Sequence, residues 1–141
     1  MIKTLKKIFV IITLLFLCGC SKSDKTYSLL DIPKYKNIDI SATEEIRVEW
    51  DICESQPVIF SIYNEEEIKE IIDELCKKDT FIKSKEDRDG GLSRIILINI
   101  DKKETTVSLF SIYDKDTKYY YSNDNVYKKV YSIGKESGYL K

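Results

Sequence analysis

The sequence contains no histidine, the side chain on which most proton transfer and zinc binding near neutral pH depends. Nucleophiles activated by a neighbouring histidine are therefore excluded as well. Carboxylate chemistry remains possible, but no spacing of acidic residues specifically indicates it. We expect a protein that is not an enzyme, with no catalytic residue, no metal site and no cofactor.

The sequence also lacks an apolar segment long enough to cross a bilayer. Its most apolar stretch covers residues 8–17, which as a helix measure about 15 Å, against roughly 30 Å for a bilayer core. An excess of positive charge is missing too, since 23 basic residues face 24 acidic ones. This balance argues against a nucleic-acid partner, and no polybasic run for anionic lipid is present.

What the N-terminus does contain is an export signal. Three lysines precede the apolar stretch, and Leu17-Cys18-Gly19-Cys20 follows it. This motif resembles the lipobox of bacterial prolipoproteins. The resemblance implies that a diacylglyceryl group is attached to Cys20 and that residues 1–19 are removed as a signal peptide. Cys18 is a poor alternative, because bulky Leu17 would stand where a small residue is needed before the cleavage site.

The lipobox also implies a location and an organisation for the mature chain. Two acyl chains hold a protein firmly to a bilayer, so the chain is expected on the extracytoplasmic face of the cell membrane. Abundant Ile and Lys, with Ala42 as the single alanine, resemble the usage of low-GC Gram-positive lipoproteins. The polar residues 20–36 are predicted to be the lipidated cysteine and a flexible tether, and residues 37–141 a single domain.

Within this domain the sequence predicts a hairpin and then a helix. Apolar and charged residues alternate over residues 46–52, and β-forming residues return over 58–63, as in two antiparallel strands. The helix is predicted over residues 65–78, where Asn64 supplies an N-cap and apolar residues recur at helical spacing.

The residues after the helix predict a series of strands. Residues 94–100 are apolar on both faces, which favours a central strand, and 105–113 and a strand opening at Tyr119 follow it. Residues from 126 onward are ambiguous between a last strand and a short helix ended by Gly134. The expected fold is α+β, with a mostly antiparallel sheet of about five or six strands and one main helix on one face.

This order of elements resembles a family of small Gram-positive lipoprotein domains of unknown function. The resemblance rests on the hairpin, the segment Ile68-x-x-Ile71-Ile72-x-x-Leu75, the isoleucine-rich strand, and the strand opening with Tyr119-Tyr120. These motifs are structural, and they imply no activity.

Two cysteines, Cys53 and Cys76, remain in the mature chain besides the lipidated one. A disulfide between them would close a loop of about 24 residues and stabilise the fold by roughly 3 kcal/mol. Because Cys76 lies on the apolar stripe of the helix, a buried free thiol is equally suited to it. Of the two alternatives we favour free thiols.

Ten tyrosines are the most unusual feature of the composition, and they concentrate in the last third of the chain. Tyrosine is common both at binding surfaces and on half-buried strands. We predict that Tyr113, Tyr119 and Tyr121 share an exposed face that binds a partner, and that Tyr120 points into the core.

Three functions remain open at this point. The first is a non-catalytic, membrane-anchored domain that binds a cell-surface protein or an envelope polymer. The second is a structural or regulatory lipoprotein that acts on a neighbouring membrane protein. The third is a cell-envelope enzyme that uses carboxylates such as Glu49 or Asp51.

Overall fold

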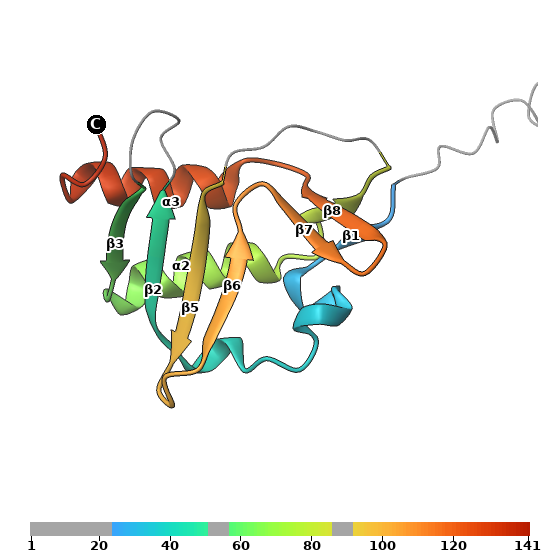
Figure 1. Cartoon of the computed structure of the whole chain (residues 1–141), viewed down its shortest axis with the longest axis horizontal. Coiled ribbons are helices and arrows are strands. Elements are labelled where there is room, and N and C mark those ends of the chain that lie inside the picture. The colour runs from blue at the N-terminus through green and yellow to red at the C-terminus, as the bar shows by residue number, and fades with distance from the viewer. Residues whose placement is uncertain (1–23, 51–56, 86–91) are drawn as a thin grey trace, which may run out of the picture.

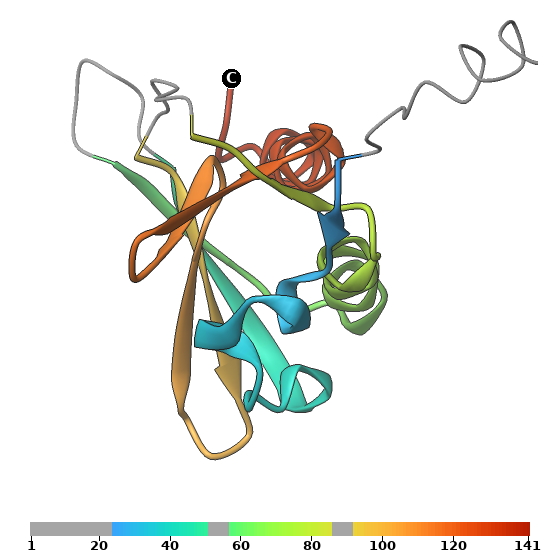
Figure 2. The same ribbon diagram turned by 90° about the vertical axis from the view of Figure 1, so that its right-hand side faces the viewer.

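The structure, a computed structural model, describes residues 24–50, 57–85 and 92–141. Two four-stranded antiparallel sheets and two α-helices build the fold, and the expected α+β class is confirmed. The central sheet has the strand order β3-β2-β5-β6 and the end sheet the order β1-β4-β8-β7. Both helices lie on the same side of the central sheet (Figures 1 and 2). The strands therefore divide between two sheets, where the sequence predicted one.

The central sheet contains the predicted hairpin and the predicted central strand. Its strands are β2 (Thr43–Trp50), β3 (Val58–Ile62), β5 (Arg94–Asn99) and β6 (Glu104–Ser108). Strands β2 and β3 pair in the expected antiparallel register, with Ile46 opposite Ile62. Strand β5 lies between β2 and β6, and its apolar residues are buried on both faces, with Ile95 and Leu97 on one and Ile96 and Ile98 on the other.

Helix α2 (Glu65–Cys76) is the element that the sequence specifies best. The Asn64 side chain accepts hydrogen bonds from the backbone N–H groups of Glu66 (3.0 Å) and Glu67 (3.1 Å), as an N-cap does. The helix ends two residues before the predicted end. Its apolar stripe packs on the central sheet with Ile68, Ile71 and Leu75 buried.

Residues from 125 onward form a second helix, α3 (Asn125–Glu136), which resolves the ambiguity between strand and helix. The expectation that Gly134 ends this helix is wrong. A Cβ at Gly134 would lie 2.7 Å from Leu140 Cδ1 and 2.8 Å from Phe60 Cζ, so glycine here permits close packing inside the helix. Gly138, at φ +78°, follows the helix end and supplies the left-handed conformation typical of a C-cap.

The end sheet forms because the chain leaves the central sheet after β6. The Ser108 hydroxyl accepts hydrogen bonds from the N–H groups of Phe110 (3.2 Å) and Ser111 (3.4 Å), which turns the backbone. The predicted strand over 105–113 is therefore two strands in different sheets. The strands of the end sheet are β1 (Thr26–Tyr27), β4 (Phe81–Lys83), β7 (Ser111–Asp114) and β8 (Thr117–Tyr121).

The prediction that residues 20–36 form a tether is wrong from residue 24 onward; residues 20–23 lie outside the described residues. Strand β1 pairs with β4, and two short 3₁₀ turns follow it, Leu29–Asp31 and Pro33–Tyr35. Leu29 and Ile32 are completely buried, and the Tyr35 hydroxyl donates to the Thr106 carbonyl at 2.8 Å. Burial raises the pKa of Tyr35 to about 12.

The segment is polar in composition but carries its few apolar side chains on one side. A continuous hydrophobic core extends from Leu29 to Leu140 and joins both sheets with both helices. The residues from 24 onward therefore contain the elements of a complete folding unit.

Candidate functional site

The surface predicted from the tyrosines is not present as expected. Tyr119 is only 3% exposed and packs edge-on against Tyr27, with 5.4 Å between ring centroids. The Tyr121 ring contacts Phe81, its hydroxyl donates to the Ser108 carbonyl at 2.8 Å, and burial raises its pKa above the ordinary value. The two rings do share a face of β8, but this face points into the core, so the prediction of exposure is wrong.

The physical reason lies in the segment mistaken for a tether. Because Tyr27 in β1 and Phe81 in β4 pack on the Tyr119 and Tyr121 rings, these rings are covered. Tyr120, on the opposite face of β8, is buried as predicted, but it does not belong to the continuous core that contains Tyr119. Of the three tyrosines proposed for binding, only Tyr113 is exposed, at 57%, and the Lys118 ammonium lies 4.7 Å from its ring centroid.

The cysteine predictions fall partly outside the described residues, which include neither Cys20 nor Cys53. Cys76 is a free, half-buried thiol at the end of α2. Burial raises the pKa of the Cys76 thiol, and the nearby Asp73 carboxylate adds to the effect. Since the thiolate is the reactive form, this environment makes Cys76 a poor nucleophile at neutral pH.

We expect both mature-domain thiols to be free. Alkylation of a chain beginning at residue 21, unfolded without reductant, should add two labels, on Cys53 and Cys76. In the native protein Cys76 should react more slowly than in the unfolded one, because of its raised pKa. No label before reduction and two labels after it would instead establish a disulfide.

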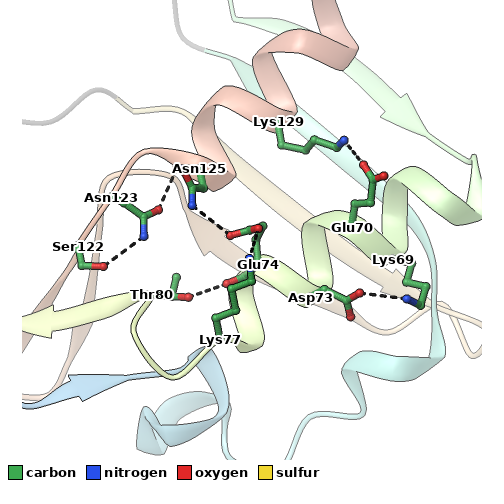
Figure 3. A network of polar contacts seen from close by, with 10 residues as sticks. All are labelled: Lys69, Glu70, Asp73, Glu74, Lys77, Thr80, Ser122, Asn123, Asn125 and Lys129. Atoms are coloured by element: carbon green, nitrogen blue, oxygen red, sulfur yellow. Dashed lines mark hydrogen bonds and ion pairs between the residues drawn. The ribbon is translucent and has the colours of Figure 1, made fainter.

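The groove between the two helices holds the densest polar network of the described residues (Figure 3). Glu70 on α2 pairs with Lys129 on α3, and Glu74 pairs with Lys77 and accepts a hydrogen bond from Asn125 Nδ2 at 3.4 Å. Each carboxylate thus has a cation beside it. Exposed pairs of this kind each contribute about 0–1 kcal/mol. The Glu70–Lys129 pair and the Asn125–Glu74 hydrogen bond link α2 to α3, whereas the Glu74–Lys77 pair lies at the end of α2.

A second concave region lies toward the other end of α2. This region, which we call the α2 hollow, has a volume of about 710 Å³. Its apolar part comes from Tyr63, Ile68 and Ile72, and its charged rim from Glu44, Glu65, Lys69 and Asp73. Tyr63 is 67% exposed, the most exposed tyrosine among the described residues.

The charges of the α2 hollow are unbalanced. Lys69 pairs with Asp73 at 3.1 Å, which leaves Glu44 and Glu65 as an acidic excess on the rim. An apolar floor with an acidic rim suits a ligand that presents an apolar and a basic side chain. The sequence did not predict this site because its residues come from two separate segments, 41–44 and 63–73, and no pattern in the sequence shows that these segments meet.

The carboxylates considered for catalysis lie elsewhere. Glu49 pairs with Arg94 on the face of the central sheet opposite the helices, and Asp51 lies outside the described residues. Within the described parts of the chain, no group of three potential metal ligands is gathered in one place. No helix among these residues is long and apolar enough to span a membrane.

The class of protein that the described residues define is an α+β domain of two antiparallel sheets and two helices. The chain belongs to the DUF5301 family, described as a domain of unknown function, and the match covers residues 24–132. The match begins where the described structure begins. No curated protein and no solved structure matches the chain.

Proposed function

We propose that this protein is a lipoprotein of the extracytoplasmic face of the cell membrane, held there by a lipid on Cys20. The lysines, the short apolar stretch and Leu17-Cys18-Gly19-Cys20 support this location. The start of the family domain at residue 24 agrees with it, because processing before Cys20 would leave that domain whole.

We further propose that the domain is a non-catalytic binding module, and that its binding site is the α2 hollow. The observation that carries this proposal is the exposed Tyr63 side chain, which lines one hollow together with Ile68, Ile72 and the acidic residues Glu44 and Glu65. Tyrosine loses little conformational entropy on binding and offers both area and a hydroxyl. The partner is a segment of another cell-surface protein with a basic and an apolar side chain.

Photo-crosslinking in intact cells tests the site. A photoreactive phenylalanine analogue in place of Tyr63 should give a discrete crosslinked product, whereas the same analogue in place of Tyr113 should give none. Tyr113 is a matched control, because it is also a tyrosine and is similarly exposed. Glu44→Lys with Glu65→Lys should remove the product, since these changes reverse the charge of the rim.

Two results would contradict the proposal. Equal crosslinking from positions 63 and 113 would mean that the contact is unspecific. A discrete product that survives the charge reversal would mean that the acidic rim does not select the partner.

A further inference from the structure

Two lysines lie over one tyrosine ring at the point where the domain begins. The Lys25 Nζ is 5.6 Å and the Lys83 Nζ 5.0 Å from the centroid of the half-buried Tyr27 ring. The antiparallel pairing of β1 with β4, with Thr26 opposite Ile82, brings these lysines to neighbouring positions. Like charges on adjacent strands repel, so this arrangement costs stability unless an anion compensates it.

The compensation that the described residues provide for Lys83 comes from tyrosine rather than from a carboxylate, because a side-chain hydrogen bond with Tyr27 is the main cause of the raised pKa of Lys83. Neither Lys25 nor Lys83 forms an ion pair with a carboxylate of the described chain. The nearby carboxylate, Asp31, accepts a hydrogen bond from the Ser28 N–H at 2.8 Å, and this bond is the main cause of its lowered pKa. Lys78 and Lys25 both act on Asp31 electrostatically, so these two lysines share one acidic group.

The lysine patch consists of Lys25 and Lys83 over the Tyr27 ring and of Lys78, which acts on Asp31 as Lys25 does. One member, Lys25, lies close in sequence to the proposed lipid. Lys25 is five residues from Cys20, so the two are separated by at most about 18 Å in any chain conformation. A domain of this length has a radius of gyration of about 13 Å, and is therefore roughly 35 Å across. A lipid on Cys20 would thus keep this end of the domain beside the bilayer.

We propose that the lysine patch binds the phosphate groups of anionic phospholipids in the membrane that holds Cys20. This inference rests on the proposed lipid anchor. Opposite charge attracts lysines to an anionic surface within about a Debye length, some 8 Å at physiological salt. Tyr27 adds an amphipathic ring of the kind that is enriched at membrane interfaces.

The proposal also gives the domain an orientation. Helix α2 runs from the α2 hollow at its N-terminal end toward the lysine patch at its C-terminal end, where Lys78 follows the helix (Figure 1). With the patch on the lipid, the part of the hollow at Glu65 lies about 18 Å along the twelve residues of α2 from the helix end that precedes Lys78. It is then open to partners outside the membrane.

The rate of lysine acetylation in the reconstituted, processed lipoprotein tests whether the lysine patch contacts anionic lipid. The protein is placed in vesicles of phosphatidylcholine alone or with added phosphatidylglycerol, acetylated briefly and analysed by peptide mass spectrometry. Phosphatidylglycerol should slow acetylation of Lys25, Lys78 and Lys83 roughly fivefold and leave Lys102 and Lys103 unchanged. The control lysines lie at the turn between β5 and β6, away from the start of the domain (Figure 1).

Two further arms make the test specific. High salt should remove the protection, because it shortens the Debye length to about 3 Å at 1 M. Lys25→Gln with Lys83→Gln should make the acetylation of Lys78 independent of phosphatidylglycerol, whereas Lys102→Gln with Lys103→Gln should not.

The possible failures are distinguishable. If the protein binds the vesicles but its patch lysines react at the same rate in both kinds of vesicle, the proposed lipid contact of the patch is wrong. The proposed lipid anchor on Cys20 is not affected by that result. Equal protection of patch and control lysines overturns the patch as well, because the contact is then unspecific. If the processed protein carries no lipid and stays in solution, both the proposed anchor on Cys20 and the proposed lipid contact of the patch are wrong.

Discussion

Leu29→Ala is expected to lower the free energy of unfolding by about 2–5 kcal/mol, the range for truncating a buried leucine. Leu29 is completely inaccessible to solvent and belongs to the core shared by both sheets and both helices. If residues 24–36 were a tether, the same substitution would leave the stability unchanged. Urea unfolding of the mature chain, followed by circular dichroism, measures the difference through the shift of the midpoint.

Lys36→Ala provides the matched control, since Lys36 is exposed in the same segment and should change stability by less than about 0.5 kcal/mol. Ile32→Val, which removes one methyl group from a buried side chain, should fall between the two at about 0.5–1.5 kcal/mol. Equal midpoints for Leu29→Ala and Lys36→Ala would mean that this segment does not contribute to the core.

Cys20→Ser is expected to abolish lipid attachment completely. The thiol is the group that receives the diacylglyceryl moiety, and cleavage before residue 20 follows that step in the proteins whose lipobox this one resembles. The wild-type chain should incorporate labelled fatty acid and partition into the detergent phase. The variant should incorporate none and retain residues 1–19. Cys18→Ser, two residues away, should behave as the wild type.

The parts of the fold that the sequence predicts correctly depend on local patterns. Helix α2 is specified by the Asn64 cap and by an apolar repeat within twelve residues. The central position of β5 follows from its apolar character on both faces. Such features require no knowledge of which distant segments meet.

The two errors that concern the tether and the tyrosine surface share one physical cause, which is pairing over a long sequence separation. Strand β1 is two residues long, too short for any periodic pattern, and it exists because Thr26 pairs with Ile82. Without that pairing, residues 24–36 look like a polar linker, and the Tyr119 and Tyr121 face of β8 has nothing to cover it. Because residues 24–36 were predicted to be a tether, the face of β8 that they cover was wrongly predicted to be an exposed binding surface.

The lysine patch illustrates the same limit for charge. The composition, with 23 basic and 24 acidic residues, contains no polybasic run. Lys25, Lys78 and Lys83 come from two segments more than fifty residues apart, and only the β1–β4 pairing brings these segments together. Charge counted along a chain therefore does not exclude a basic surface on the folded domain.

The most direct test of the proposed function is the mass of the mature N-terminal peptide, obtained from protein extracted from membranes of the cells that make it. The account predicts a peptide that begins at Cys20 and carries a diacylglyceryl group on the cysteine sulfur. An N-terminus at any other residue, or an unmodified Cys20, would contradict it.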